Sequence, residues 1–327
     1  MPVGFRLRAP EPADAERVAE ISNAETIEAL GFGDTTVAEL LADWTSPQEI
    51  EGPRSAVVED AAGVIVAYLF LEADHVKHEV FGYATLALDP PPGLPAAVLG
   101  EIEERAAWWH DRAGIANGVL RLGALDAPGA WPGVLAAAGY RQTRRFLLMR
   151  RPLDGEVEAP QWPDGIALAP FERDGDARAV HAALADAFQD HWGPPFEPYE
   201  RWWHTIFEQP GMEFRDDLVL VARAGDEIAG VLLAAARASE SRDAGYVAEL
   251  GVRRAFRRQG LARALLLESF GRFRALGRRE ALLHVDAESE TGATGVYRTA
   301  GMQEQRMYAN WEKAPGADEV ITARASP

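Results

Sequence analysis

Residues 250–262 form a stretch rich in arginine and glycine that carries the residue types best suited to bind an anion. The stretch follows an apolar run typical of a strand and precedes apolar residues at helical spacing. A strand that enters a helix through such a bend points several backbone N–H groups at one place, where the helix dipole adds positive charge. Gly260 lets the backbone approach a ligand and Ala262 keeps the next turn small, while Arg257 and Arg258 can neutralise a diphosphate. We therefore expect a phosphate-binding loop here.

The elements that must position this loop follow a definite order along the chain. Residues 218–223 and 228–233 predict a hairpin that turns at residues 225–226. Downstream, residues 281–285 predict a strand, which is followed by a loop and a helix that ends within residues 296–302.

Arg257-x-x-Gly260-x-Ala262 resembles the acetyl-CoA pyrophosphate loop of the GNAT N-acetyltransferase superfamily, and residues 296–302 resemble the end of its second signature. The resemblance implies an α/β fold, in which a twisted, mixed and mostly antiparallel sheet is flanked by helices. It also implies acetyl-CoA as cosubstrate and no metal. The cofactor-binding residues that it implies are Leu250, Gly251, Val252, Arg257, Arg258, Gln259, Gly260, Leu261, Ala262, Ser289 and Tyr297.

The chain also repeats itself with a period of about 162 residues. The matched pairs are 5–10 with 166–171, 12–24 with 174–188, 63–70 with 227–234, 85–89 with 249–253, and 133–140 with 295–302. We expect two tandem GNAT domains: a degenerate N-terminal domain at 1–153, a linker at 154–163, and a catalytic domain at 164–327. This arrangement is similar to that of mycothiol synthases.

The first copy lacks the residues that would bind the cofactor. In place of the arginine-glycine loop it has residues 89–96, whose four prolines have no N–H to offer a phosphate and whose Asp89 would repel one. Leu135 stands at the position that answers Tyr297. We therefore expect the first half to be a scaffold that binds no cofactor.

Acetyl transfer from a thioester to an amine needs a base, an acid for the leaving thiolate, and donors for the developing oxyanion. The chain has no cysteine to be acetylated, so direct transfer in a ternary complex is the simplest route. By resemblance, the N–H of Val252 or of Leu250 would hold the thioester carbonyl. Tyr297 lies where the family places the tyrosine that reaches the CoA sulfur. The alternative for Tyr297 is a core residue that packs with Met302.

Glu249 is the candidate general base, because it lies on the strand that meets the pantetheine arm in this family. The alternative is a solvated glutamate on an exposed strand face. His284 on the next strand can titrate near neutrality and ranks below Glu249. Further options are His191 and His204.

The acceptor segment and one loop position complete the candidate site. Trp192, Phe196 and Tyr199 are expected to line an acceptor pocket. The later aromatic residues, Trp202, Trp203 and Phe207, are expected to face a core, and Trp203 and Phe207 lie at i and i+4. Ser289 replaces the asparagine that the family usually has, and its side chain has a shorter reach.

The overall composition excludes some classes of partner. A net charge of −18 over 327 residues argues against nonspecific binding to nucleic acid or to membrane surfaces. The charge either serves solubility or helps to attract a cationic amine. We found no signal-peptide pattern, no apolar run long enough to span a bilayer, and no cysteine for a disulfide. We expect a cytoplasmic monomer or homodimer.

Together these features predict an acetyl-CoA-dependent N-acetyltransferase that acts on the primary amine of a small molecule. A cysteinyl pseudodisaccharide, as for mycothiol synthases, is one candidate acceptor, and aminoglycosides and amino acids are equally open. A non-catalytic acyl-CoA sensor or interaction protein is the alternative from another class.

Overall fold

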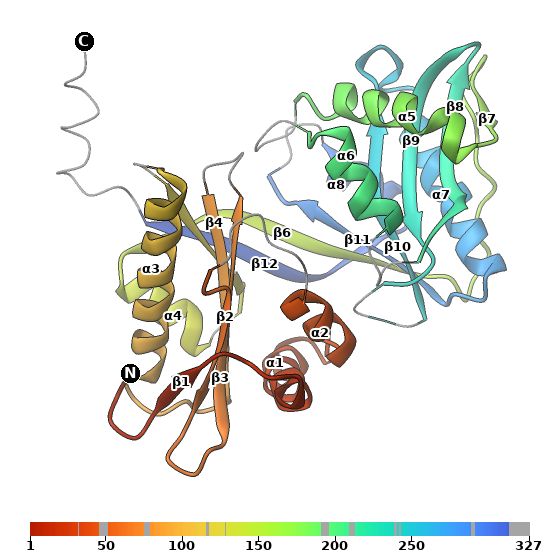
Figure 1. Ribbon diagram of the computed structural model, residues 1–327. Coiled ribbons are helices and arrows are strands. Elements are labelled where there is room, and N and C mark those ends of the chain that lie inside the picture. The colour runs from red at the N-terminus through yellow and green to blue at the C-terminus, as the bar shows by residue number, and fades with distance from the viewer. Residues whose placement is uncertain are drawn as a thin grey trace. The chain divides into compact units, whose positions relative to one another are not determined.

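The computed structural model describes residues 1–31, 33–45, 52–74, 79–115, 118–127, 129–190, 196–208, 213–238, 241, 243–288 and 292–313. The chain forms two compact units (Figure 1). Unit 1 comprises Met1–Arg145 with Met307–Pro327, and unit 2 comprises Phe146–Arg306. Helices and a mixed sheet make up each unit, which confirms the expected α/β class.

Unit 1 is built around six described strands in the order β1-β2-β3-β4-β5-β12, of which only β4 and β5 pair in parallel. Its elements are β1 (Arg6–Arg8), a 3-10 turn (Pro12–Asp14), α1 (Ala15–Leu30), α2 (Val37–Thr45), β2 (Ser55–Glu59), β3 (Ile65–Asp74), β4 (Glu79–Leu86), α3 (Leu94–Ala113), β5 (Val119–Leu125), α4 (Ala130–Ala137), and parts of β6 (Tyr140–Pro152) and β12 (Gln303–Lys313).

Unit 2 repeats this pattern with the strand order β7-β8-β9-β10-β11-β6, in which β10 and β11 are the parallel pair among the described strands. Its elements are β7 (Ala167–Ala169), α5 (Arg173–Ala187), α6 (Tyr199–Trp203), a π-helical turn (His204–Glu208), β8 (Phe214–Ala224), β9 (Glu227–Ala235), β10 (Ala244–Val252), a 3-10 turn (Arg254–Phe256), α7 (Leu261–Ala275), β11 (Glu280–Asp286) and α8 (Ala293–Thr299).

The chain crosses between the units within two strands, β6 and β12. Residues 146–152 of β6 pair with β11 inside unit 2, and residues 308–312 of β12 pair with β5 inside unit 1. A sheet edge left unpaired exposes a row of N–H and C=O groups, and each exchanged strand covers such an edge. The units therefore divide the chain at residues other than the expected 1–153, 154–163 and 164–327. Residues 154–163 form no helix or strand.

Helices cover both faces of the sheet in unit 2. Adding a Cβ to Gly251 would bring it within 2.9 Å of Ala187 on α5, whereas a Cβ on Gly245 would lie 2.3 Å from the ring of Phe273 on α7. Figure 1 shows α5 and α6 on one side of these strands. The buried residues of α7 are mostly apolar, and each buried leucine or phenylalanine contributes about 1.5–3 kcal/mol. The buried α7 residues are Leu261, Ala264, Leu265, Leu266, Leu267, Ser269, Phe270 and Phe273.

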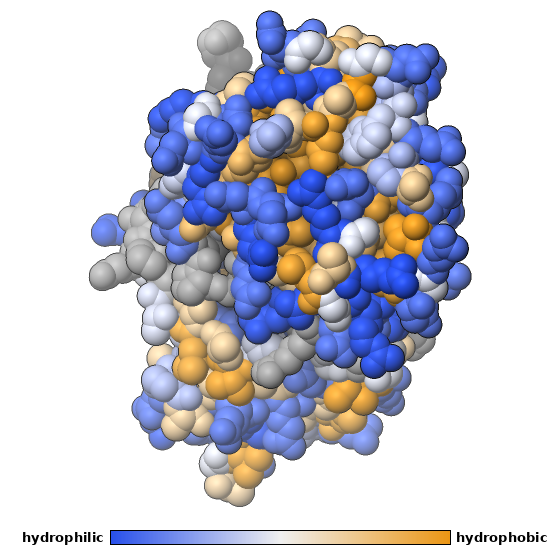
Figure 2. Space-filling view, turned by 90° about the vertical axis from the view of Figure 1, so that its right-hand side faces the viewer, coloured by the Kyte–Doolittle hydropathy of each residue, from blue (hydrophilic) through white to orange (hydrophobic). Residues whose placement is uncertain are grey.

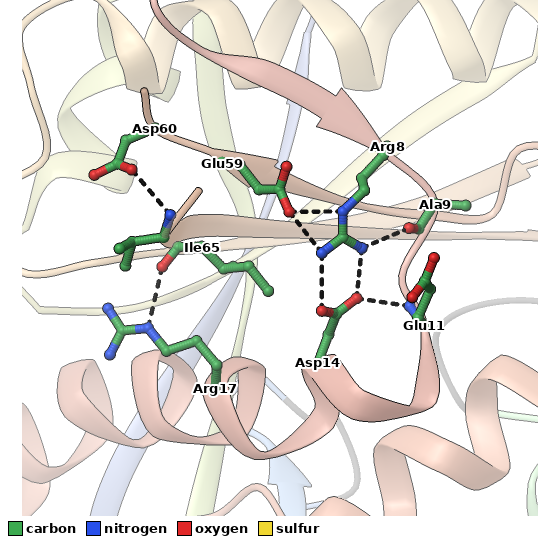
Figure 3. A network of polar contacts seen from close by, with 9 residues as sticks. Arg8, Ala9, Glu11, Asp14, Arg17, Glu59, Asp60 and Ile65 are labelled. Atoms are coloured by element: carbon green, nitrogen blue, oxygen red, sulfur yellow. Dashed lines mark hydrogen bonds and ion pairs between the residues drawn. The ribbon is translucent and has the colours of Figure 1, made fainter. Parts of the chain in front are cut away.

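An arginine ties the first strand of unit 1 to its neighbours (Figure 3). Arg8 Nε donates to Glu59 Oε1 at 2.7 Å, and Arg8 Nη2 donates to Asp14 Oδ1 at 2.9 Å. Asp14 also accepts from the N–H of Glu11 at 2.7 Å. The guanidinium holds the pKa of the Asp14 carboxyl below its ordinary value. The network therefore fixes the short strand β1 to β2 and to the start of α1.

Figure 2 shows the side of the molecule on which β7 and β8 lie in Figure 1. Hydrophilic residues cover much of this face, and apolar patches lie between them. Folded proteins keep much apolar area on their surfaces, so patches of this kind do not by themselves mark a site.

Candidate active site

The parallel strands β10 and β11 separate after three residues and leave a fork between them. Their pairing runs from Ala244 to Tyr246, although β10 continues to Val252 and β11 to Asp286. On its other edge β10 carries an irregularity between Val247 and Glu249, which bends the strand at the same place. A fork of this kind leaves backbone groups available to an extended ligand that lies between the strands.

The backbone register shows which amide groups face the fork. Arg253 N–H donates to Ala229 O of β9 at 3.0 Å. Because backbone groups of a strand alternate between its two edges, the N–H groups of Leu250 and Val252 point away from β9 and toward the fork. These are the two donors that the sequence analysis named for the thioester carbonyl.

The loop after β10 presents unpaired N–H groups at the start of α7. Gly260 is the N-cap and adopts φ +86°, a conformation that L side chains rarely adopt. It has no side chain to cap the helix, and Ala264 N–H is the first to bond back, to Gly260 O at 3.0 Å. The N–H groups of Leu261, Ala262 and Arg263 therefore stay available at the positive end of the helix dipole.

The two arginines of the loop motif differ in their surroundings. Arg257 is braced against the protein: it donates to Val252 O at 3.1 Å, to Ala187 O at 2.9 Å and to Asp190 at 2.7 Å. Arg258 is exposed, adopts φ +61°, and has no ion-pair or hydrogen-bond partner among the described residues. A left-handed arginine costs about 1–2 kcal/mol, and such strain is often found at functional sites. Arg258 is therefore the arginine of the motif that stays available to an anion.

The other motif residues contribute mainly through their backbone. Leu261 is 1% exposed and packs into the α7 core, so its side chain takes no part in a polar site. Gln259 is exposed and its amide donates to Ala255 O at 3.4 Å. Ser289, expected at the cofactor, lies outside the described residues.

Glu249 lies on the face of the sheet that α5 and α6 cover. Its cross-strand partner Leu233 belongs to the apolar cluster that includes Trp202. Trp202 Nε1 donates to Glu249 Oε2 at 3.4 Å. Burial raises the pKa of Glu249 to about 7; the Trp202 hydrogen bond opposes this shift and the negative charge of Glu197 adds to it. A carboxyl group with this pKa is suited to general base catalysis near neutrality, and Glu249 is half-buried under α6, unlike a fully solvated strand residue.

Tyr297 lies on α8, which packs against α7 and β11. It is 9% exposed, and burial raises the pKa of its hydroxyl to about 12. Within the described ranges the hydroxyl has no hydrogen-bond partner. A buried hydroxyl that stays protonated at neutral pH can donate its proton. Met302 N–H bonds to the main-chain oxygen of Tyr297 at 3.0 Å, so this residue also helps to end the helix.

Of the histidines named as alternative bases, His284 lies at the fork and His204 is exposed. His284 Nδ1 lies 3.1 Å from Tyr246 Oη, and this pair stands where the fork opens. His204 is exposed and lies 2.9 Å from Glu208, away from the fork strands. His191 and Trp192 lie outside the described residues.

The aromatic residues of the acceptor segment pack around the ring of His181. The ring centroid of His181 lies 5.3 Å from that of Phe196, 5.5 Å from Tyr199 and 5.3 Å from Trp202. Trp202 is 0% exposed. The burial of Trp202 agrees with its expected place in a core, whereas sequence reasoning did not single out His181. The ring centroids of Trp203 and Phe207 lie 4.9 Å apart with the planes tilted by 52°, and both side chains pack against the apolar cluster, as expected.

Unit 1 has different residues at the corresponding positions. In unit 1, Ser22 on α1 contacts Thr85 on β4. In unit 2, Leu184 on α5 lies against Gly251 on β10. The structure therefore matches Thr85 with Gly251, whereas the repeat in the sequence had matched Thr85 with Glu249. Tyr83 then stands where unit 2 has Glu249, and burial raises the pKa of Tyr83 well above its ordinary value. Strand β4 ends at Leu86, within the segment 85–89 that the repeat matched to 249–253, and Asp89 turns the chain with φ +54° before the prolines.

Neither a metal site nor a membrane span is found in the described part of the chain. No group of three or more His, Asp or Glu side chains there could hold a metal ion. None of the described helices is both long enough and apolar enough to cross a bilayer.

Comparison with known proteins identifies the family. Residues 177–302, which include the fork, the loop and α8, match the Acetyltransferase (GNAT) family. A protein of Thermobispora bispora named mycothiol acetyltransferase is 33% identical over 233 residues, which are 68% of this chain and 76% of that relative. The chain belongs to the GNAT acetyltransferase family. It is therefore an N-acetyltransferase by family, as the loop motif predicted.

Solved structures support the tandem arrangement of this GNAT acetyltransferase. A GCN5-related N-acetyltransferase from Sphaerobacter thermophilus matches with a TM-score of 0.79 at 29% identity, over 97% of this chain and 98% of that one. A tandem GNAT protein from the clavulanic acid biosynthesis pathway has the same fold, with a TM-score of 0.63 at 16% identity over 95% of this chain and 99% of that one. Two GNAT units in one chain therefore account for the internal repeat.

Proposed function

We propose that unit 2 transfers an acetyl group from acetyl-CoA directly to the primary amine of a small molecule. The observation that carries this proposal is Glu249, a half-buried carboxyl group on the strand that borders the fork, which accepts from Trp202 Nε1 at 3.4 Å and whose pKa burial raises to about 7. A primary amine is protonated at neutral pH, so a base of this strength is what the reaction needs.

The residues of unit 2 fit acetyl-CoA. The N–H groups of Leu261 and Ala262 at the helix start, together with Arg258, would hold the diphosphate. The N–H groups of Leu250 and Val252, which face the fork, would bind the arm and the thioester oxygen. When bound, acetyl-CoA supplies the acetyl group as a thioester whose carbonyl carbon is open to attack.

The side chains would then move protons as follows. Glu249, as a carboxylate, accepts one proton from the ammonium group of the acceptor and so frees the nitrogen lone pair. As the new C–N bond forms and the C–S bond breaks, Val252 N–H stabilises the negative charge on the oxygen. Tyr297 donates its hydroxyl proton to the departing sulfur, and the second proton lost by nitrogen restores the hydroxyl. The products are an acetamide, a free thiol and one proton on Glu249.

For the acceptor, we propose the cysteinyl pseudodisaccharide that precedes mycothiol. The support is the name shared by the relatives from Thermobispora bispora and Streptomyces scabiei, mycothiol acetyltransferase. The carboxyl groups of Glu249 and Glu197, whose charge acts on Glu249, also suit a cationic amine.

The test is thiol release from acetyl-CoA with a panel of amines that includes cysteinyl sugars, aminoglycosides, amino acids and polyamines. We expect turnover with the cysteinyl sugar, and loss of most of kcat in Glu249→Gln and Tyr297→Phe with CoA affinity retained. Turnover with another amine alone would overturn the proposed acceptor. Tight CoA binding without turnover on any amine would instead favour a sensor.

A further inference from the structure

Trp202 stands in direct contact with the candidate base. Its indole Nε1 lies 3.4 Å from Glu249 Oε2, a long hydrogen bond that joins α6 to β10. Among the described residues Trp202 is the hydrogen-bond partner of this carboxyl group, and Oε1 has none. One oxygen of the carboxylate is thus held while the other stays available to a proton.

The surroundings of Trp202 fix the position of its indole. The side chain is fully buried, and its ring packs at 5.3 Å from His181, at 6.0 Å from Tyr199 and at 5.8 Å from Phe207. His181 is in turn anchored, because its Nε2 lies 2.8 Å from Glu197 O. A side chain packed on several sides in this way has few rotamers open to it, so its N–H stays aimed at the strand.

We propose that Trp202 is a positioning residue of the acetyl transfer: its buried indole N–H holds Glu249 Oε2, which orients the carboxyl group and leaves Oε1 for the acceptor amine. This inference rests on the proposed function, since it requires Glu249 to be the base.

The contact has a defined effect on the pH dependence. The hydrogen bond from Trp202 favours the carboxylate and so lowers the pKa of Glu249, whereas burial and the charge of Glu197 raise it. His181 on α5, whose ring centroid lies 5.3 Å from that of Trp202, is a further titratable group in this cluster. Without the indole N–H, the carboxyl group holds its proton to higher pH, and less of it is active as a base at neutrality.

The experiment is the pH profile of kcat/KM for Trp202→Phe, with Trp203→Phe as the matched control. Trp203 lies on the same helix and donates to Glu208 at 2.9 Å, away from the base. We expect the acidic limb of Trp202→Phe to move up by about half a pH unit or more, which lowers kcat/KM at pH 6 by about threefold or more. The profile of Trp203→Phe should stay in place, and Glu197→Gln should move the limb down.

Because Trp202 is fully buried, a second variant guards against a failure to fold. A benzothiophene analogue of tryptophan at position 202 keeps the ring volume and lacks the N–H donor, so it should give the same upward shift. An unmoved limb in this variant would overturn the inference.

The two proposals can fail separately. If Glu249→Gln keeps the wild-type rate, the base is not Glu249 and the proposed mechanism fails with this inference. If Glu249→Gln is inactive but both changes at position 202 leave the profile in place, only the role of Trp202 is wrong.

Discussion

The guanidinium of Arg257 donates to the main-chain oxygen of Val252 at 3.1 Å, so the first arginine of the loop motif braces the strand that precedes it. It also reaches Ala187 O at the end of α5 and the carboxyl group of Asp190. Arg258, by contrast, is exposed and has no partner within the described ranges. We therefore propose different roles for the two adjacent arginines: Arg257 holds the loop in place, and Arg258 binds the anion.

This division predicts different outcomes for two alanine substitutions. Arg258→Ala should weaken CoA binding by about tenfold or more, since it removes a charged hydrogen-bond donor, and should leave the unfolding temperature nearly unchanged. Arg257→Ala should weaken binding and also lower the free energy of unfolding by about 1–3 kcal/mol, because the part-buried carbonyl groups of Val252 and Ala187 lose their donor. Calorimetric titration and thermal unfolding measure the two effects. Equal behaviour of both variants would contradict the division.

Each chain should bind one CoA, in unit 2. The loop of unit 1 has prolines at 90, 91, 92 and 95, which have no N–H for a phosphate, and Asp89 opposes an anion. Titration calorimetry should give a stoichiometry of one, and the double change Arg257→Ala with Arg258→Ala should abolish it. Binding of two CoA molecules per chain would show that the reasoning about the prolines is wrong.

Gly251 should not tolerate a side chain. A Cβ there would lie 2.9 Å from Ala187 Cβ and 3.1 Å from Leu184 Cδ2, both on α5, so the helix would have to move. We expect Gly251→Ala to cost about 1–3 kcal/mol of stability and to lower kcat, because α5 supplies Ala187 O to Arg257. Gly175→Ala on the same helix is the control: nothing lies within 4 Å of its Cβ, and the change should be neutral or stabilising. Denaturant unfolding of both variants decides the point.

The raised pKa of Glu249 predicts a pH-dependent cost to stability. In the folded chain the Glu249 carboxyl keeps its proton up to about pH 7, whereas the ordinary pKa of a glutamate is 4.5. The contribution of Glu249 to the free energy of unfolding is therefore fully present below pH 4.5 and is lost as the pH rises through 7. Glu249→Gln lacks this titration, so its stability relative to the wild type should grow by up to about 3 kcal/mol between pH 4.5 and pH 7. Thermal unfolding across this range measures the difference. A stability difference between Glu249→Gln and the wild type that stays constant with pH would mean that Glu249 is not desolvated. Glu200→Gln, at an exposed position of α6, serves as the control.

The features that the sequence determined by itself are those with local causes. The helix that opens after Gly260 and the hairpin that turns at residues 225–226 follow from residue types and short spacings, and the structure has both in their expected places. The missing N–H groups of residues 90–92 follow directly from their being proline. The order of these elements was enough to indicate the GNAT family, which the relatives confirm.

The tertiary structure decided what depends on residues far apart in the chain. Arg257 and Arg258 are alike in sequence, and only the approach of α5 makes one a brace and leaves the other exposed. Trp202 lies 47 positions from Glu249, and their contact exists because α6 packs over β10. The same packing desolvates Glu249 and moves its pKa toward neutrality. The pairing of β6 with β11 and of β12 with β5 likewise depends on which strand edges are left unpaired in each unit. No local sequence pattern predicts this pairing.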